Sequence, residues 1–211
     1  MNEKYYFNVK RKRPEEIYAK VSDYFRSEIL SQYANSKSMM KIQEKITIRA
    51  LELLDLRKKD ALILDAGCGP GFAAMVLKEK GYITIALDII SEFLNYYNIK
   101  DLNPIAADMC FTPFKSNTFD AILSISALQW IYRDLSNEEM HFLLNSLSKS
   151  FFQILKPNSR VIIQFYPKNN DIMEKTGRII TENTDFKGNF IIDNPNSKKK
   201  RRIYLLLNKE K

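Results

Sequence analysis

The chain has 211 residues, of which 45% are hydrophobic, and 33 Lys and Arg against 25 Asp and Glu give it a net charge of +8. A chain of this length can bury one substantial core, so we expect one domain with an N-terminal arm. No apolar run approaches the roughly 20 residues of a membrane span, and no apolar signal region follows the charged N-terminus; both favour a soluble, cytoplasmic protein. Two cysteines and one histidine are too few for a metal site, so we expect no metal and small, reduced cysteines.

The N-terminal part predicts an arm over residues 1–40, followed by the main domain over residues 41–211. Within the arm, two acids follow Pro14, which is typical of the first turn of a helix. Apolar residues then recur at helical spacing over residues 42–54 and predict a packed helix that leads into a sheet.

From residue 61 onward, short apolar runs alternate with helical patterns, which is the pattern of a doubly wound parallel sheet. The strands expected in this part of the chain are 61–65, 83–88, 105–108, 120–126 and 161–165. The helices expected between and after them are 71–80, one from Ser91, 143–155 and 172–181, the third stopped by Lys156-Pro157-Asn158. Two closing strands, 190–193 and 203–207, indicate an antiparallel hairpin. The predicted fold class is α/β and Rossmann-like, with a mostly parallel seven-stranded sheet and a C-terminal antiparallel hairpin.

The most informative motif is a glycine-rich turn that directly follows the first strand of this pattern. Glycines at 67, 69 and 71 give the spacing G-x-G-x-G and let a ligand approach the backbone closely. The dinucleotide fingerprint, G-x-G-x-x-G, has its third glycine one position later, where this chain has Phe72. This difference argues against a pyrophosphate ligand. Asp88 ends the next strand about 20 positions later, where an acid binds ribose hydroxyls. S-adenosylmethionine, which has a ribose and an adenine but no phosphate, fits this pattern best.

The other strand ends complete the expected cofactor site. Asp108 and Met109 follow the third apolar run, where such sites hold the adenine edge. Asp65 either orients the glycine turn or contacts the amine of the cofactor. The cofactor-binding residues expected from the sequence are Asp65, Gly67, Gly69, Gly71, Asp88, Ile89, Asp108, Met109 and Ser126. This order of motifs predicts a class I methyltransferase fold.

No catalytic acid or base is evident at these strand ends, where ligands of open α/β sheets bind. Neither a Ser-His-Asp set nor a cluster of metal ligands is present, and His141 falls on a predicted helix, where a packed or solvated role is expected. Methyl transfer to a ring nitrogen with a free lone pair needs positioning more than proton transfer. The positioning candidates are Tyr166, Lys168 and Asn169. Trp130 and Tyr166 either stack on an RNA base or pack at the rim of the sheet.

Two dense basic clusters, Lys10–Arg13 and Lys198–Arg202, carry much of the excess charge. Such runs are commonly solvated loops, and the second also resembles a nuclear import signal. The second cluster, made of Lys198, Lys199, Lys200, Arg201 and Arg202, lies inside the fold between the two closing strands. This position favours binding of a polyanion, most simply RNA. Tyr18, Tyr24 and Tyr33 of the arm either close over the cofactor or pack the arm against the domain.

Several strings go beyond the generic fold. They are Arg13-Pro14-Glu15-Glu16, Ile48-Arg49-Ala50-Leu51-Glu52-Leu53-Leu54, Ser124-Ile125-Ser126-Ala127-Leu128-Gln129-Trp130, Gln164-Phe165-Tyr166-Pro167-Lys168-Asn169 and Asp193-Asn194-Pro195-Asn196-Ser197-Lys198-Lys199-Lys200. Together they resemble the small-subunit ribosomal RNA guanine-N7 methyltransferases, the family of the Williams–Beuren region methyltransferase, over residues 13–207.

This resemblance implies an RNA methyltransferase that acts in ribosomal RNA processing and ribosome biogenesis. It also implies that residues 166–169 and the basic cluster at 198–202 face RNA. A small zinc-containing activator protein would pair with the edge strand of the sheet, here residues 104–107, because an unpaired short edge favours β-augmentation. The chain departs from the family in two ways. Eukaryotic members carry a long basic tail after the last strand, whereas only a few residues follow Leu207 here, so a nuclear location is less favoured. In addition, Gln32 stands where the family tends to have a basic residue.

Two other functions remain compatible with the sequence. A small-molecule methyltransferase, such as one acting on a quinone precursor, would share the cofactor half of the site. A non-catalytic ribosome-assembly factor would retain the fold and bind precursor RNA. A steep salt dependence of RNA binding would argue against the first, and methyl transfer to rRNA would exclude the second as the sole role.

Overall fold

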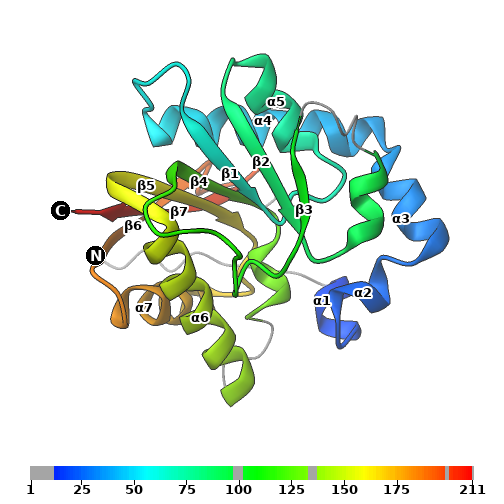
Figure 1. The fold of residues 1–211 in the computed structure, drawn as a ribbon. Coiled ribbons are helices and arrows are strands. Elements are labelled where there is room, and N and C mark those ends of the chain that lie inside the picture. Colours follow the sequence, from blue (N-terminus) through cyan, green and yellow to red (C-terminus); the bar gives the residue numbers. More distant parts are fainter. Residues whose placement is uncertain (1–11, 97–101, 133–136, 198–199, 211) are drawn as a thin grey trace.

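The computed structural model describes residues 12–96, 102–132, 137–197 and 200–210 (Figure 1). The helices are α1 (Pro14–Ile17), α2 (Val21–Tyr24), α3 (Ser27–Ala34), α4 (Lys37–Leu54), α5 (Phe72–Glu79), α6 (Glu138–Ile154) and α7 (Asn170–Glu182), with short 3-10 helices η1 (Ser91–Tyr96) and η2 (Leu128–Trp130). The strands are β1 (Leu62–Ala66), β2 (Ile83–Asp88), β3 (Pro104–Ala106), β4 (Phe119–Ile125), β5 (Leu155–Phe165), β6 (Phe186–Asp193) and β7 (Arg202–Lys209).

These strands form one seven-stranded sheet in the order β3-β2-β1-β4-β5-β7-β6. The first five strands along that order run parallel, and β7 pairs antiparallel with both β5 and β6. The predicted fold class, including the closing antiparallel hairpin, is therefore confirmed. The carboxyl ends of β1, β2, β3 and β4 meet at one edge of the sheet, next to the point where the strand order reverses between β1 and β4. A ligand is expected at that point in an open α/β sheet.

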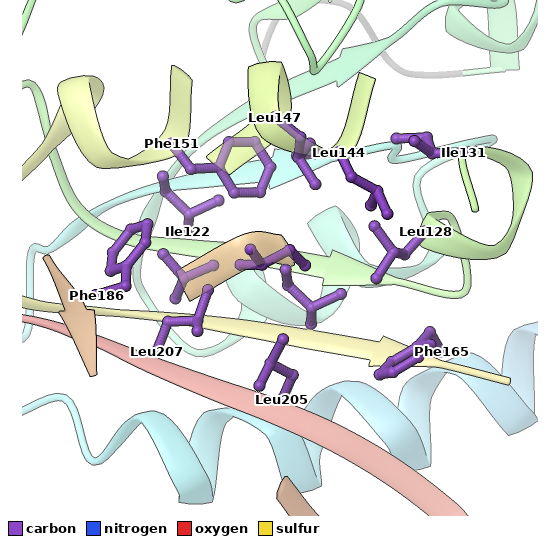
Figure 2. Packing of buried hydrophobic residues seen from close by; sticks show 14 of the residues in the cluster. Ile122, Leu128, Ile131, Leu144, Leu147, Phe151, Phe165, Phe186, Leu205 and Leu207 are labelled. Atoms are coloured by element: carbon purple, nitrogen blue, oxygen red, sulfur yellow. The ribbon is translucent and has the colours of Figure 1, made fainter. Parts of the chain in front are cut away.

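Helices cover both faces of the sheet (Figure 1). Along β4 the side chains alternate: Ala121 and Leu123 pack toward α4 and α5, whereas Ile122 packs toward α6 and α7. Figure 2 shows this second layer, in which Leu147 and Phe151 of α6 lie over the sheet. All five of these side chains are at most 1% exposed, so the central strands of the sheet are tightly packed on both faces.

Several expected elements differ from the structure in their bounds: β3 ends at Ala106, α6 starts at Glu138, β5 starts at Leu155 and β6 starts at Phe186. The long helix ends at Ile154, before the Lys156-Pro157-Asn158 stop that the sequence suggested, because Leu155 already pairs with Phe119 as the first residue of β5. The segment that follows Leu155 is an irregularity in the strand, where the register between β4 and β5 shifts. The helix expected from Ser91 is a 3-10 helix over its described length.

The arm consists of three short helices, α1 to α3, and α4 begins at Lys37, where the Oγ of Ser36 accepts a hydrogen bond of 3.3 Å from the Met39 amide. The boundary at residue 40 between arm and domain thus falls inside a continuous helix. The division into an arm and a domain stays a prediction.

Candidate active site

A cavity of about 430 Å³ opens at the carboxyl ends of β1, β2 and β4 and at the segment after β3. The predicted cofactor residues that line it are Asp65, Gly67, Gly69, Asp88, Ile89, Asp108, Met109 and Ser126. Of the predicted set, Gly71 does not line the cavity, because it caps the start of α5 at a φ of 89°. The arm forms another wall of the cavity, through residues that include Lys20, Phe25 and Tyr33.

The glycine turn is held against the neighbouring strand and is bare toward the cavity. The amides of Gly67 and Cys68 both donate to the carbonyl of Leu87, at 2.8 and 3.0 Å. A Cβ atom at Gly67 would lie 2.4 Å from the Cβ of Ala127, and its φ of +75° is left-handed, so only glycine fits there. At Gly69 the φ is +52° and no atom lies within 4 Å of a Cβ position, which leaves room for a ligand to approach the backbone.

Asp88 is fixed by backbone donors on both sides. Its Oδ2 accepts a hydrogen bond of 2.7 Å from the Gly69 amide, and its Oδ1 accepts one of 2.8 Å from the Ile90 amide. The residue is 8% exposed, and burial raises the pKa of its carboxyl while these backbone hydrogen bonds oppose the shift. The glycine turn and the ribose-binding candidate are therefore one rigid unit.

Asp65 is more deeply buried, at 1% exposure. Burial raises the pKa of its carboxyl to about 7, the charge of Asp88 adds to the shift, and the Ala74 amide opposes it. Among the described residues, no hydrogen-bond partner meets its Oδ2 atom. A buried acceptor without a partner is costly, and an ammonium group of a ligand would satisfy it. The observed arrangement thus favours the second of the two roles expected for Asp65, contact with the cofactor amine.

On the adenine side, Asp108 accepts a hydrogen bond of 2.8 Å from the amide of Cys110 through its Oδ1 atom. Ile89 is 56% exposed although it is apolar and lines the cavity. An apolar side chain left open beside a carboxylate offers a surface for a purine ring. The residues present therefore fit S-adenosylmethionine: a bare turn, a carboxylate for the ribose, an apolar and acidic adenine side, and an unpaired acceptor for the amine.

A chain of hydrogen bonds crosses the floor of the site and was not expected from the sequence. The Oγ of Ser126 accepts from Nε2 of Gln43 at 3.3 Å and donates to Oε1 of Gln164 at 2.8 Å. Gln43 and Gln164 are 6% and 0% exposed, and Ser126 adopts a φ of +58°, a region uncommon for serine. The one signal in the sequence was a polar residue at an apolar helical position of α4.

Trp130 lines the cavity and packs against two rings of the arm. Its ring centroid lies 5.7 Å from that of Tyr24 and 5.9 Å from that of Phe25, and Phe25 in turn contacts Phe93 at 5.0 Å. These contacts match the second interpretation of Trp130, packing at the rim, while stacking on an RNA base stays a prediction. The second interpretation of the arm tyrosines, packing onto the domain, also matches these contacts for Tyr24.

The segment that holds the three positioning candidates is covered by α1. The guanidinium of Arg13 donates to the carbonyl of Tyr166, and Lys168 forms an ion pair of 2.5 Å with Glu16. Asn169 caps α7, where its Oδ1 accepts from the Ile172 amide at 2.8 Å. None of Tyr166, Lys168 and Asn169 lines the described cavity. Their role toward a substrate stays a prediction.

The loop between β6 and β7 carries the second basic cluster, whose Lys198 and Lys199 lie outside the described residues. Lys200 is exposed, and Nε of Arg201 donates to the Pro195 carbonyl at 2.9 Å. Arg202 begins β7 and donates to the Arg201 carbonyl at 2.9 Å. Because Ile203 pairs with Phe165 at the carboxyl end of β5, this loop lies on the same edge of the sheet as the cavity. Of the first basic cluster, Lys10 and Arg11 also fall outside the described part.

Within the ranges that the structure describes, no group of three or more His, Cys, Asp and Glu side chains could hold a metal ion. In the same ranges, no helix is both long and apolar enough to cross a membrane. Cys68 and Cys110 are both buried, and among the described residues neither forms a disulfide. Burial, followed by the charge of Asp108, raises the pKa of the Cys110 thiol.

Sequence comparisons match residues 64–163 to the family described as a methyltransferase domain. The 18S rRNA (guanine-N(7))-methyltransferase of Bos taurus is 33% identical over 197 residues, which cover 87% of this chain and 67% of that protein. The 18S rRNA (guanine(1575)-N(7))-methyltransferase of Saccharomyces cerevisiae is 33% identical over 194 residues, covering 88% and 68%. The 18S rRNA (guanine-N(7))-methyltransferase bud23 of Schizosaccharomyces pombe is 29% identical over 92% of this chain and 74% of its own length.

Solved structures with the same fold are more distant in sequence. Magnesium protoporphyrin IX methyltransferase from Synechocystis with bound S-adenosylmethionine has a TM-score of 0.65 at 15% identity, covering 96% of this chain and all of that one. A chain from the complex of the Haloferax volcanii Trm112 methyltransferase activator with a methyltransferase has a TM-score of 0.60 at 16% identity, covering 88% and 99%. At these identities the likeness shows the fold alone.

Proposed function

This chain belongs to the family of the 18S rRNA (guanine-N7)-methyltransferases, and from that premise we propose that it methylates a guanine of small-subunit ribosomal RNA at N7 during ribosome biogenesis. The observation that carries the proposal is the convergence of Gly67, Gly69, Asp88 and Asp108 on one cavity. The relatives named for this activity align with most of the chain. The cofactor is S-adenosylmethionine.

The chemistry asks little of the protein beyond placement. When bound, the cofactor supplies a methyl carbon on a sulfonium; the N7 lone pair forms a bond to that carbon as the carbon–sulfur bond breaks. No proton leaves N7, so the reaction needs no general base. Catalysis then depends on orientation and exclusion of water, and the acids that line the cavity are assigned to binding rather than to proton transfer.

The residues of this chain divide into holding and shaping roles. Asp88 would accept hydrogen bonds from the ribose hydroxyls, Asp65 would accept one from the amine, and Asp108 with Ile89 and Met109 would enclose the adenine. Trp130, supported by Tyr24 and Phe25, would form the wall beside the reacting methyl group. Tyr166, Lys168 and Asn169 are proposed to contact the RNA after α1 moves from them.

The β6–β7 loop is proposed as an RNA-binding element. Of its cations, Lys200, Arg201 and Arg202 are described and lie at the same edge of the sheet as the cavity, and phosphate contacts position an RNA without reading its sequence. The small-molecule alternative offers no account of that placement. The scaffold alternative is excluded as the sole role if methyl transfer is observed.

We propose that a small zinc-containing activator protein pairs with β3. This strand is one edge of the sheet, is three residues long, and among the described strands pairs with β2 alone. The Ala107 amide donates to the Asp88 carbonyl at 3.0 Å. Since the backbone amides of successive residues in a strand point to opposite sides, the amide of Ala106 faces the open side. A short, exposed edge is suited to strand addition. A cytoplasmic location stays a prediction, which imaging of a tagged chain would test.

A reconstituted assay tests the proposed function. The purified chain, with and without its co-expressed activator, is incubated with labelled S-adenosylmethionine and small-subunit RNA from cells that lack the gene. We expect 7-methylguanosine in the nucleoside digest. Asp88→Asn, which keeps the side-chain size, is the matched variant that should lose cofactor binding. Label in another nucleoside, or none with an intact complex, contradicts the proposal.

A further inference from the structure

Two side chains that precede the predicted cofactor motifs, Tyr33 of α3 and Gln43 of α4, line the cavity. Gln43 hydrogen-bonds the side chain of Tyr33 and donates through Nε2 to Ser126 at 3.3 Å. Tyr33 is also held by ring contacts with Phe25 at 5.2 Å and Phe72 at 5.8 Å between centroids. The arm is therefore connected to the end of β4 through a polar link inside the cavity.

This link lies beside the glycine turn. Ala127, which follows Ser126, is so close to Gly67 that a Cβ atom at position 67 would meet its Cβ at 2.4 Å. The unpaired Oδ2 of Asp65 marks the place for an ammonium group just before the same turn. Since the ammonium and carboxylate of an amino acid share one carbon atom, a carboxylate must be bound within a few ångströms of that place.

The charges around the cavity oppose a carboxylate. Among the described residues that line it, four are acids, Asp65, Asp88, Asp108 and Glu139, and one is basic, Lys20, which is exposed. An anionic group placed among these acids needs a neutral donor or the glycine-turn amides, because charge-assisted hydrogen bonds are strong enough to offset the repulsion.

Tyr33 has the properties of that donor. Burial raises the pKa of its phenol to about 12, an effect that the Gln43 hydrogen bond opposes, so the phenol keeps its proton at neutral pH. A phenol carries one donor hydrogen and accepts through its oxygen, so Tyr33 is able to donate to an acceptor in the cavity that it lines.

We propose that Tyr33 binds the carboxylate of the methionine part of the cofactor and that Gln43 is the positioning residue that holds Tyr33 and Ser126 in place. The inference rests on the proposed function, whose cofactor it concerns. It makes the arm a part of the cofactor site and makes the enzyme selective for a cofactor with an intact amino-acid tail.

Calorimetry with two ligands tests this assignment. S-adenosylmethionine is compared with decarboxylated S-adenosylmethionine, which keeps the sulfonium, adenosine and amine. In Tyr33→Phe, which retains the ring contacts, affinity for the first is expected to fall at least about tenfold, as for loss of a hydrogen bond to a charged group, with affinity for the second unchanged within about twofold. Gln43→Leu is expected to lose the same selectivity. Tyr82→Phe, at the opposite edge of the sheet before β2, is the matched control and should bind both ligands like the wild type.

Three results would overturn the inference while leaving the proposed function intact. Equally weakened binding of both ligands would show that Tyr33 only shapes the cavity. Unchanged affinity of both variants for S-adenosylmethionine would place the carboxylate elsewhere. A selective effect in Lys20→Ala, with Tyr33→Phe unaffected, would assign the carboxylate to Lys20. Failure of the wild type to bind either ligand would contradict the proposed function as well.

Discussion

Cofactor affinity is expected to depend on pH through Asp65. Burial, with the nearby charge of Asp88, raises the pKa of the Asp65 carboxyl to about 7 in the protein without ligand. An ammonium group beside its unpaired Oδ2 atom favours the ionised form. Binding of S-adenosylmethionine should therefore draw the carboxyl into its charged state and release a proton whenever the free protein holds it protonated.

The magnitude follows from the fraction ionised. With a pKa of about 7, the ionised fraction of Asp65 falls roughly 25-fold between about pH 7.5 and about pH 5.5, and apparent affinity falls by the same factor. The upper limit of this window avoids the amine of the ligand, whose ordinary pKa is about 8. Titration calorimetry at about pH 6, repeated in buffers of different ionisation enthalpy, should detect release of nearly one proton per ligand bound.

The Asp65→Asn variant is the control for this reasoning. Its affinity should be lower than that of the wild type at neutral pH but nearly constant across the same window. Asp88 also has a raised pKa, and any pH dependence that remains in Asp65→Asn is assigned to Asp88 and the other acids that line the cavity, Asp108 and Glu139. A wild-type affinity that varies less than about threefold over two pH units, against the roughly 25-fold expected, would refute the assignment of an ammonium group to Asp65.

The same raised pKa predicts how the stability of the ligand-free protein depends on pH. A carboxyl whose folded pKa lies above its unfolded value binds protons more tightly in the native state. Its contribution to stability is full below the unfolded pKa of about 4 and is lost as the pH rises through about 7. At pH above 7, Asp65→Asn should therefore be more stable than the wild type, by at most about 4 kcal/mol, in urea unfolding. An equal free-energy difference at both ends of the range would contradict the shift.

Three further substitutions test the glycine turn, the sheet edge and the basic loop. Gly67→Ala should destabilise the fold by about 1–3 kcal/mol and abolish cofactor binding, because its Cβ would overlap that of Ala127. A variant with the cofactor affinity and the melting temperature of the wild type would contradict this. Ala106→Pro should prevent co-purification of the activator yet leave cofactor affinity unchanged, since it removes an amide on the open side of β3; retained co-purification speaks against pairing there. Lys200→Gln should weaken RNA binding. It should also lower the slope of log affinity against log salt concentration by about 1 for each phosphate that the loop no longer neutralises. The control is Lys59→Gln, at an exposed lysine before β1, which should change neither quantity; equal effects of the two variants would argue against specific binding by the loop.

The cofactor-binding half of the site could be predicted from the sequence because the motifs that form it are local. Glycines and acids directly follow short apolar runs, so the order of β1, β2 and β3 along the chain places Gly67, Asp88 and Asp108 together once the sheet is parallel. The irregular start of β5 was not readable, because the pairing of Leu155 with Phe119 depends on a distant strand rather than on the proline that follows.

The parts that the sequence did not reveal depend on contacts between distant segments. Gln43 and Gln164 meet through Ser126, yet each stands in a helix or strand where its neighbours give no sign of a shared partner. In the same way, the cover that α1 forms over residues 166–169 relies on an ion pair between Glu16 and Lys168. Charge patterning within either segment does not predict such a pair, because i,i+4 rules apply only inside one helix.

Mapping of 7-methylguanosine in small-subunit rRNA from cells that lack this gene tests the central claim most directly. We expect that one guanine loses its N7 methyl group, that the wild-type gene restores it, and that an Asp88→Asn gene does not. Full methylation of every 7-methylguanosine in the deletion strain, or restoration by Asp88→Asn, would contradict the proposed function.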